Sequence, residues 1–272
     1  MNFVYNNNAL DNNKFTKIMD NNKENIKEIR KNFCVIIIDN KLYFVKTINK
    51  KCPLTPIINL SNDKEIDPTN QVANFLLTNQ KFAPLFVNIY SISQNEHYDY
   101  YIMDYIKYGD FSNVLPILNT KWKFSLLMQS LLSIYILNHK IKLFHNDLYY
   151  NGVVRNIMVD HVETPYSINQ SLNNVIITIN VRKFCTKMID FGRCSNKQAF
   201  RTTEYHNKHF SQIKYISEPL LFTYFFFKTF GFEEFNMLNQ MGSEISKNSS
   251  TLIDFDSKFL IKIYNKFKKY IM

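Results

Sequence analysis

Glycine is scarce in this sequence of 272 residues: it occurs five times, and the first glycine is Gly109. Glycine is the residue that lets a backbone come close to a phosphate group. A glycine-rich phosphate-binding loop is therefore excluded from the whole segment before Gly109.

Zinc sites, membrane spans and export signals are also missing from the sequence. The four cysteines form no C-x-x-C pair, and no histidine cluster accompanies them at the spacing of a zinc site. The run closest to transmembrane length, Leu220–Phe227, is far too short to cross a bilayer. The first residues contain no basic stretch followed by an apolar one. We therefore expect an intracellular, cytoplasmic protein with reduced thiols and no membrane span.

Apolar residues and positive charge are what the sequence has in quantity. It is 46% hydrophobic and 15% aromatic, which is enough to bury a substantial core. Its net charge of +10 favours anionic partners, namely nucleotide phosphates, nucleic acid, acidic proteins or anionic membranes, without choosing among them. No nucleic-acid-binding module is recognisable, and the sequence identifies no protein partner.

Strands dominate the first part of the chain, after a polar, asparagine-rich leader over residues 1–30. Two β-branched runs separated by a short polar turn predict a hairpin, and a helix-start signal at Asp67 predicts a helix. Two further apolar runs predict strands. The predicted elements are the hairpin strands Phe33–Asp39 and Leu42–Ile48, a helix over 67–79, and the strands Leu85–Ile92 and Tyr98–Met103.

Helices dominate the rest of the chain. Apolar residues at helical spacing over Trp122–Asn138 predict a long helix with a buried side. A short strand, Ile157–Val159, and a strand-rich segment over 160–187 come next, and the remainder reads as mostly helical, ending in an amphipathic helix with a basic face. This order predicts an α+β fold with two lobes: a β-rich small lobe at 31–106 and a reduced, mostly helical large lobe at 107–272.

Two segments of the sequence carry chemistry. LFHNDLYYNGVVRNIMV spans residues 143–159, and KMIDFGR spans residues 187–193. They resemble the catalytic loop H-x-D-x-x-x-x-N and the metal-binding D-F-G of protein kinases. Either motif alone would be a weak signal. The two in this order, with the expected helix before the first and strands beside both, predict a protein-kinase-like fold.

The resemblance implies phosphoryl transfer from ATP, with Mg²⁺ as the cofactor. Asp147 would orient the acceptor hydroxyl and act as the catalytic base. Asn156 and Asp190 would hold the metal ion, because hard cations take oxygen ligands. Arg155, which stands where tyrosine kinases carry an arginine, would stabilise the transferring phosphate. The implied activity is transfer of the γ-phosphate to serine, threonine or tyrosine of a protein substrate.

The position of the metal-binding asparagine requires a choice. In the family the asparagine follows the aspartate by five residues, and Gly152 holds that place here. Asn151 is one residue early, and Asn156 is four residues late. We choose Asn156 because the strand Ile157–Val159 follows it directly, as it does in the family. The choice requires a four-residue insertion around Tyr150–Val153.

The first lobe should supply nucleotide contacts. The strand that ends in F-V-K resembles the V-A-I-K strand of kinases, so Lys46 would contact the α- and β-phosphates. The segment Tyr101–Asp110 resembles the hinge that joins the lobes. By that resemblance Met103 would be the gatekeeper, and backbone groups of Asp104 and Ile106 would meet the adenine ring.

Several features depart from the family. Without a glycine loop, the segment between about Lys23 and Val35 would have to cover the phosphates. The helix over 67–79 has no glutamate to pair with Lys46, and Gln71 stands where the acid is expected. The family's active kinases carry both features, so each departure weakens the case for an active enzyme.

The large lobe also differs from the family. Asn146 replaces the arginine of H-R-D, so control through a phosphorylated activation loop is not expected. The chain after Gly192 is short, and Glu218-Pro219 is only an echo of A-P-E. Such reduced features resemble the divergent protein kinases of large DNA viruses over residues 33–195. That resemblance would place the protein in the host cytoplasm or the virion.

Three other interpretations stay open beside the active protein kinase. The short tail and the missing glycine loop also fit a small-molecule phosphotransferase of the choline or aminoglycoside kinase type. The missing glycines and glutamate favour a pseudokinase that binds or scaffolds without transfer. Asp147 and Asp190 favour an active enzyme, because no requirement of the fold demands both. The charge alone permits a nucleic-acid-binding protein.

Overall fold

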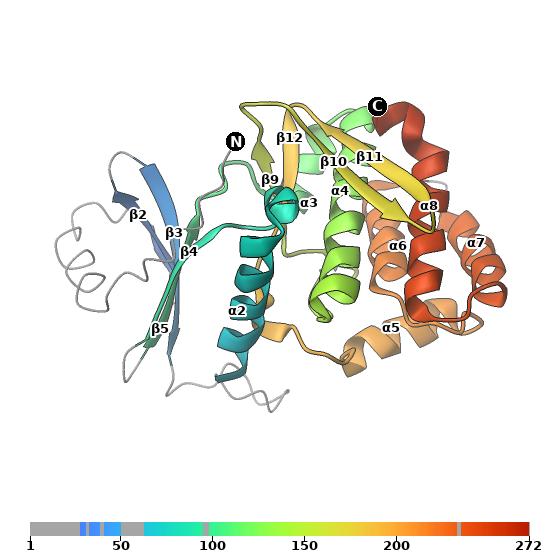
Figure 1. Cartoon of the computed structure of the whole chain (residues 1–272), viewed down its shortest axis with the longest axis horizontal. Helices are drawn as coiled ribbons and strands as arrows, with labels where there is room; N and C mark the ends of the chain where they lie inside the picture. Colours follow the sequence, from blue (N-terminus) through green and yellow to red (C-terminus); the bar gives the residue numbers. More distant parts are fainter. Residues whose placement is uncertain are drawn as a thin grey trace. The chain divides into compact units, whose positions relative to one another are not determined.

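The protein is described by a computed structural model (Figure 1). The structure describes residues 28–30, 33–38, 41–49, 63–94, 98–232 and 235–271. The leader expected over residues 1–30 lies outside this part of the chain except for its last three residues. Most of the segment expected to cover the phosphates, and the loop at 50–62, lie outside it too.

The chain divides into two compact units. The first unit comprises residues 1–83 and 87–106, and the second comprises residues 84–86 and 107–272. The first unit holds the larger sheet, and the second holds most of the helices. The structure is therefore α+β with antiparallel sheets, which confirms the coarse fold class.

The sheet of the first unit is five-stranded and antiparallel, in the order β1-β2-β3-β5-β4. The predicted hairpin is confirmed as β2 and β3, in which Val35 and Val45 are buried. β5 is paired along its whole length with residues 43–49 of β3, which puts Lys46 opposite Tyr101. The strands are β1 (Glu28–Arg30), β2 (Phe33–Ile38), β3 (Lys41–Asn49), β4 (Ile89–Gln94) and β5 (Tyr98–Asp104).

One expected strand begins later than the sequence indicated. The helix α2 (Asp63–Thr78) starts four residues before the predicted helix. A 3₁₀ helix, η2 (Gln80–Leu85), follows it, so the strand predicted from Leu85 starts only at Ile89. Pro84 explains the difference, because its fixed φ and missing N–H suit a 3₁₀ turn and cannot serve a strand ladder.

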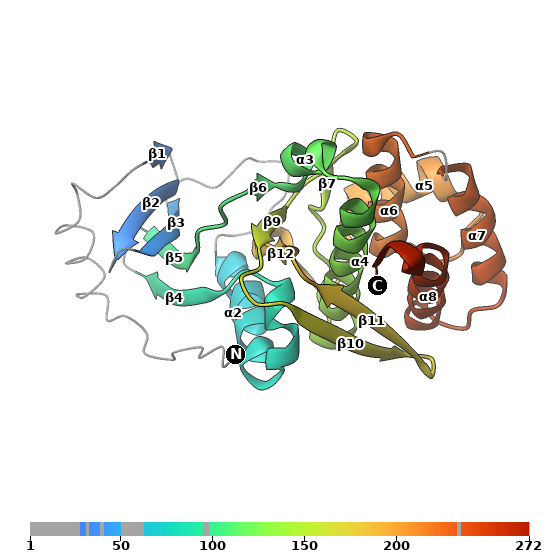
Figure 2. The ribbon, with the colours of Figure 1, turned by 90° about the horizontal axis from the view of Figure 1, so that it is seen from above.

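A long buried helix forms the centre of the second unit. The helix α4 (Thr120–Ile136) confirms the prediction for this segment, and its first turn is capped by Asn119, whose side chain accepts from the N–H of Trp122 at 3.1 Å. It continues as a π-helical turn, η4 (Leu137–Ile141), and ends at Lys142 in a left-handed conformation. α4 packs against α6 (Glu218–Phe230) and α8 (Leu252–Ile271), as Figures 1 and 2 show.

The remaining helices complete this core. α7 (Phe235–Lys247) packs against α6 and α8, and α5 (Phe200–Phe210) packs against α6. α8 has the amphipathic pattern expected from the sequence: the ring of Phe267 stacks 3.9 Å from that of Phe124 in α4. Its exposed face carries the basic residues Lys262, Lys266, Lys268 and Lys269. The described part of the chain contains no helix that is both long and apolar enough to cross a membrane.

Short strands connect the helices of the second unit. β12 (Phe184–Met188), β9 (Ile157–His161) and β6 (Gly109–Asp110) form one antiparallel sheet in that order. The predicted strand-rich segment contains a hairpin, β10 (Tyr166–Leu172) and β11 (Val175–Val181), which lies against α4 and α8 (Figure 2). The smaller elements are α3 (Phe111–Val114), η3 (Leu115–Ile117), β7 (Tyr149–Tyr150), β8 (Val153–Val154) and η5 (Phe191–Arg193).

Gln129 of α4 fixes this sheet to the central helix. Its side chain is fully buried, accepts from the N–H of Thr186 at 2.9 Å and donates to the carbonyl of Phe184 at 3.3 Å. A buried amide with both ends satisfied stabilises one register of β12 on α4, because any slip would leave polar atoms unpaired. β12 and β9 are therefore held firmly at the point where the candidate site begins.

Candidate functional site

The pairing of β9 with β12 brings two predicted site residues to one edge of the sheet. Ile157 is opposite Met188 in the ladder. One residue beyond that pair, the N–H of Ile189 donates to the carbonyl of Asn156 at 3.0 Å. Asn156 therefore stands just before β9, and Asp190 stands just after β12, at the same end of two hydrogen-bonded strands.

The histidine of the first motif joins the loop to this edge. His145 is fully buried, and its Nε2 lies 2.9 Å from the carbonyl oxygen of Ile189. Burial lowers the pKa of His145, so the neutral ring with Nε2–H as donor is the form that fits this contact. The ring also packs 6.0 Å from that of Phe191. His145 thus holds the loop of the first motif against the strand of the second.

Asn156 is bonded directly to Asp147. Its side-chain Nδ2 donates to the backbone carbonyl of Asp147 at 2.7 Å and to the carboxylate Oδ2 of the same residue at 3.1 Å. Through these contacts Asp147 and Asn156 share one small volume, with Asp190 beside the backbone of Asn156. The three carboxylate and amide side chains that the sequence singled out come from one cluster of the second unit.

The segment between Asp147 and Asn156, where the kinase motif would require a four-residue insertion, contains a complete hairpin. Tyr149 is opposite Val154 and Tyr150 is opposite Val153, and Asn151 and Gly152 turn the chain with φ values of 50° and 81°. The N–H of Arg155 then donates to the carbonyl of Leu148 at 2.9 Å, which closes the excursion. The four extra residues therefore leave the loop and return to it.

A signal for this hairpin was present in the sequence and was missed. Asn-Gly between aromatic and β-branched residues is the strongest short-range mark of a two-residue hairpin. The sequence analysis identified the extra residues only as an insertion. The hairpin also settles where the two asparagines lie: Asn151 is at the tip of the turn, and Asn156 contacts Asp147.

Three arginines surround the carboxylate of Asp147, whose side chain is only 3% exposed. Arg155 pairs closely with Oδ2 through Nη2. Nη1 of Arg193 donates to Oδ1 at 3.3 Å, and Nη1 of Arg201 lies 3.9 Å from the same oxygen. Sequence analysis identified Arg155 but not the other two. Arg193 is the last residue of the second motif segment, whereas Arg201 lies in the first turn of α5, and only the fold brings it here.

Several residues of this cluster have a left-handed backbone. The φ value is 62° for Asn146, 59° for Asn156 and 59° for Asp190. Such values are uncommon for residues with a side chain, and asparagine and aspartate tolerate them best. Conformations of this kind persist only where the surrounding structure holds them, and they gather at functional sites. Their concentration here supports a functional role for the cluster.

Asn146 binds the segment that follows the second motif. Its amide nitrogen donates to the carbonyl of Lys197 at 3.0 Å and to the hydroxyl of Ser195 at 3.1 Å. Its amide oxygen accepts from the N–H of Ala199 at 2.7 Å. A neutral side chain therefore fixes this segment at the position that corresponds to the arginine of the H-R-D motif.

The carboxylate of Glu218 binds the backbone of the loop that contains His145 and Asn146. Glu218 is fully buried at the start of α6, and its carboxylate accepts from the backbone N–H groups of His145 at 3.0 Å and Asn146 at 2.7 Å. Burial raises the pKa of Glu218 to about 7, and the two backbone bonds oppose part of that rise. Sequence analysis noted Glu218 only as an echo of A-P-E. An acidic residue at the head of the apolar run Leu220–Phe227 was the available signal.

A second buried acid anchors α8 next to this region. Asp256 accepts from the hydroxyl of Ser217 at 2.5 Å, and its Oδ2 lies 2.7 Å from Nε2 of His139. Burial raises the pKa of Asp256, and the contact with His139 opposes the rise. Ser217 is also the N-cap of α6, where its oxygen accepts from the N–H of Leu220 at 3.2 Å. The position of Glu218 thus depends on contacts with both η4 and α8.

The first unit contains the residues that the sequence predicted as nucleotide contacts. Lys46 is half-buried on β3, and Met103 lies opposite Phe44 on β5. The N–H of Asp104 already donates to the carbonyl of Asn88 at 3.1 Å, so this N–H is not free for an adenine edge. The carboxylate of Asp104 accepts from Nδ2 of Asn88 at 2.6 Å and from the hydroxyl of Tyr90. Ile106 is buried at the end of the unit.

The oxygen donors of the cluster fit a hard divalent cation in part. Because Nδ2 of Asn156 is used on Asp147, the amide oxygen is the atom left for a cation. Asp190 adds a carboxylate at the same edge of the sheet. The described residues include no group of three or more His, Cys, Asp or Glu that could hold a metal alone.

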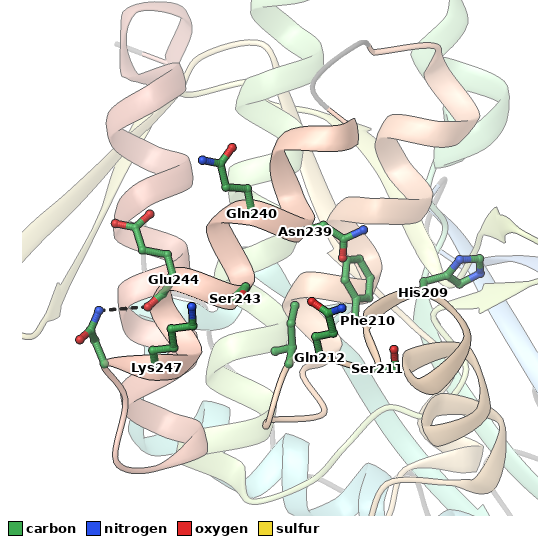
Figure 3. Close-up of a pocket in the computed structure, with 11 residues that line it drawn as sticks. His209, Phe210, Ser211, Gln212, Asn239, Gln240, Ser243, Glu244 and Lys247 are labelled. Atoms are coloured by element: carbon green, nitrogen blue, oxygen red, sulfur yellow. Dashed lines mark hydrogen bonds between the residues drawn. The ribbon is translucent and has the colours of Figure 1, made fainter.

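A separate cavity of about 640 Å³ lies in the second unit, away from these residues (Figure 3). Its walls are the C-terminal end of α5 and one face of α7, and its lining includes Gln212, Asn239, Gln240, Ser243 and Glu244. None of the predicted site residues lines it. The lining includes Ser211, Ser243 and His209, but the cavity shares no residue with the two sequence motifs, and the candidate site is therefore the cluster around Asp147.

No known family model and no curated protein matches this sequence. The functional argument therefore depends on the motifs and on the geometry of the cluster around Asp147. Three members of that cluster came from the sequence, namely Asp147, Arg155 and Asn156, with Asp190 at the adjoining edge. Only the fold revealed the contacts that four further residues make in this cluster, namely Arg193, Arg201, Asn146 and Glu218.

Proposed function

We propose that this protein is a protein kinase that transfers the γ-phosphate of ATP to a side-chain hydroxyl of a protein. The observation that carries the proposal is the convergence of Asp147, Asn156 and the start of the D-F-G segment through the contacts from Asn156 to Asp147 and Ile189. Phosphoryl transfer needs this combination of a hydroxyl-orienting carboxylate and oxygen ligands for a metal-bound triphosphate.

Asp147 would act on the acceptor hydroxyl. Its carboxylate would accept the hydroxyl proton as the oxygen attacks the γ-phosphorus. A P–O bond forms to the acceptor oxygen while the bond to the β,γ-bridging oxygen breaks, and ADP leaves with that electron pair. Because Arg155 and Arg193 each bond one oxygen of the carboxylate, the acceptor hydroxyl would compete with a guanidinium for Asp147.

Arg155 would stabilise the charge on the transferring group. Its guanidinium is one-third exposed and sits beside the carboxylate that would take the proton. A guanidinium can hold two phosphate oxygens at once in a fixed fork, and it stays charged at every relevant pH. Asn156 and Asp190 would hold Mg²⁺, which when bound would neutralise the phosphate oxygens. Asn156 would also keep Asp147 in place through its amide nitrogen.

The fold that goes with this function is the two-lobed kinase fold in a reduced form. The first unit would provide Lys46 for the phosphates and Met103, Asp104 and Ile106 for the adenine ring. The second unit would provide the reacting groups. The five-stranded sheet of the first unit and the helical second unit support this proposal, because both have the element content that the kinase lobes have.

A second candidate is a nucleotide-binding protein without transferase activity. The observation in its favour is the ion pairing of Asp147 with Arg155 and Arg193, which leaves no carboxylate oxygen unengaged. In an active enzyme these pairs have to open when the acceptor binds. In an inactive one they would remain as a structural feature of the loop.

The experiment that separates the two candidates is transfer of labelled γ-phosphate to a degenerate peptide library with fixed serine, threonine or tyrosine acceptors. We expect transfer by the wild-type protein with Mg²⁺, and a loss of about a hundredfold or more in Asp147→Asn. Glu163→Gln is the matched control, because Glu163 is an exposed acid outside the cluster. Equal transfer by Asp147→Asn and the control would refute the role of Asp147. Mg²⁺-ATP binding with no transfer by the wild type would favour the second candidate.

A further inference from the structure

The charge around Asp147 is unbalanced. Three guanidiniums, from Arg155, Arg193 and Arg201, come within 4.0 Å of one carboxylate. They belong to three separate segments: the residue after β8, the end of η5 and the first turn of α5. Bringing like charges together from distant parts of the chain is unfavourable unless an anion offsets them. The carboxylate of Asp147 by itself offsets only one of these three charges.

Arg201 has the weakest contact in this cluster. Its Nη1 is 3.9 Å from Oδ1 of Asp147, which is too long for a hydrogen bond. The same Nη1 atom is buried and has no hydrogen-bond partner among the residues that the structure describes. Buried donors are nearly always paired, so an unpaired guanidinium nitrogen in a cluster of arginines indicates a place for an acceptor that the chain itself does not supply.

Tyr150 holds two of the arginines in position. The guanidinium of Arg155 lies 5.3 Å from the centre of its ring, and that of Arg201 lies 4.9 Å from it. Both distances are within the range of favourable contacts between a cation and an aromatic ring. Tyr150 belongs to the inserted hairpin and is 44% exposed. The four extra residues of the loop therefore bring an aromatic platform to the arginine cluster.

The cluster is open to solvent. The side chains of Arg155, Arg193 and Arg201 are 33%, 38% and 34% exposed, whereas Asp147 beneath them is only 3% exposed. A ligand that approaches Asp147 would therefore meet the guanidiniums first. Arginine forks bind carboxylate and phosphate through paired hydrogen bonds, which makes these two groups the chemistry that the cluster fits best.

We propose that Arg193 and Arg201, positioned by Tyr150, bind an anionic group next to the acceptor hydroxyl, so that the substrates are acidic or phosphorylated protein segments. This inference rests on the proposed function, because it names the substrate class of the same site. An anion bound to Arg193 and Arg201 would take over the role that Asp147 now has for them. Binding of such a substrate would thereby release a carboxylate oxygen of Asp147 for the acceptor hydroxyl.

The overall charge supports the same class of partner. A net charge of +10 raises the rate of encounter with acidic segments, and the arginine cluster would then select among them. A neutral hydroxyl-bearing peptide would gain nothing from Arg193 or Arg201 and would have to separate them from Asp147 without compensation. The site should therefore discriminate against neutral sequences even when their acceptor residue is the same.

The test is equilibrium binding of fluorescein-labelled peptides to the full chain without nucleotide. One peptide carries a serine flanked by glutamates, its twin carries glutamines in their place, and a third carries phosphoserine beside the acceptor serine. We expect the wild type to bind the glutamate or phosphoserine peptide about tenfold more tightly than the glutamine twin. Comparison of the two acidic peptides shows which source of negative charge the site prefers.

Variants assign the preference to the cluster. Arg193→Gln and Arg201→Gln should each reduce the preference to about threefold or less. Arg182→Gln is the matched control, since Arg182 is an exposed arginine in the turn after β11, and it should bind as the wild type does. Arg201→Lys keeps the charge but loses the paired donors of the guanidinium. Its preference for the acidic peptide should therefore lie between that of Arg201→Gln and that of the wild type. Circular dichroism of each variant checks that the fold is retained.

Two results would overturn the inference. One is equal binding of the acidic and glutamine peptides by the wild type, which needs no variant. The other is the same preference in Arg193→Gln and Arg201→Gln as in Arg182→Gln. Because the binding assay contains no ATP, it is independent of catalysis. If acidic peptides bind selectively but no phosphate is transferred, the anion site stands and the proposed kinase activity fails.

Discussion

Asn156 donates its side-chain amide to both the backbone carbonyl and the carboxylate of Asp147, a residue nine positions earlier in the chain. The hairpin β7–β8 makes this contact possible, because it absorbs the four extra residues and returns the chain beside Leu148. Asn156 therefore meets Asp147 because the two residues are close in the folded structure, and not because of the number of residues between them. A count along the sequence had left Asn151, Gly152 and Asn156 as competitors for one role.

The first prediction concerns Asn156. Both Asn156 and Asn151 have positive φ, at 59° and 50°, so glycine can replace either without backbone strain. Asn156→Gly should reduce phosphate transfer about a hundredfold, because it removes the bonds to Asp147 and the proposed magnesium ligand. Asn151→Gly is the control and should stay within about twofold of the wild type. A magnesium titration of the transfer rate for both variants is the measurement, and equal rates would show that Asn156 has no such role.

The second prediction concerns Lys46. If Lys46 contacts the nucleotide phosphates, Lys46→Met should remove most of the rise in melting temperature that Mg²⁺-ATP gives the wild type. Lys41→Met, on the same strand, is the control, because Lys41 is exposed and donates to the hydroxyl of Tyr90. Thermal unfolding with and without Mg²⁺-ATP checks this. A ligand-induced shift that survives in Lys46→Met would contradict the role, and no shift in the wild type would favour a protein that does not bind ATP.

The third prediction uses the raised pKa of Glu218. Burial raises the pKa of Glu218 from its ordinary value of 4.5 to about 7 in the folded protein. Glu218 therefore binds a proton more tightly in the folded state than in the unfolded state. The stability it contributes is therefore present below pH 4.5 and is lost as the pH rises through about 7. Glu218→Gln removes this titration. The free energy of unfolding of the wild type minus that of the variant should fall by up to about 3 kcal/mol between about pH 5 and about pH 8.

Urea unfolding of both proteins across this pH range is the measurement for Glu218. The pKa of Asp256 is raised and those of His145 and His206 are lowered, and these groups also change the absolute stability with pH. They are present in both proteins, so the difference between wild type and variant isolates Glu218. A difference that is constant with pH, or that rises with pH, would mean that Glu218 titrates near its ordinary value.

The fourth prediction concerns the turn of the inserted hairpin. Gly152 has φ of +81°, and a Cβ atom built there meets no described atom within 4 Å, so the cost of Gly152→Ala is conformational and should be about 1–2 kcal/mol. The strain also shifts the return of the chain to Asn156, so transfer should fall. Val153→Ala, an exposed change on the same hairpin, should cost less than about 0.5 kcal/mol. Urea unfolding and the transfer assay together check both effects, and a wild-type rate in Gly152→Ala would separate the hairpin from catalysis.

Local patterns predicted the elements well where one local signal dominated. The β-branched runs on either side of a polar turn predicted β2 and β3, and helical spacing predicted α4 and α8. The strand expected from Leu85 was wrong because Pro84 favoured a 3₁₀ turn over an apolar strand. The Asn-Gly hairpin could have been predicted from its dipeptide, since its signal is as local as that of the others.

By itself the sequence determined the candidate site residues, because Asp147, Asn156 and Asp190 lie in or beside short motifs whose spacing is local. It could not determine the partners of Asp147. Arg193 and Arg201 are 46 and 54 residues away from it, and Glu218 reaches the loop from the start of α6. Those contacts depend on how β9, β12, α5 and α6 pack around α4. Packing of distant segments is decided by the burial of their apolar faces together, and no local pattern records which polar side chains that burial brings into contact.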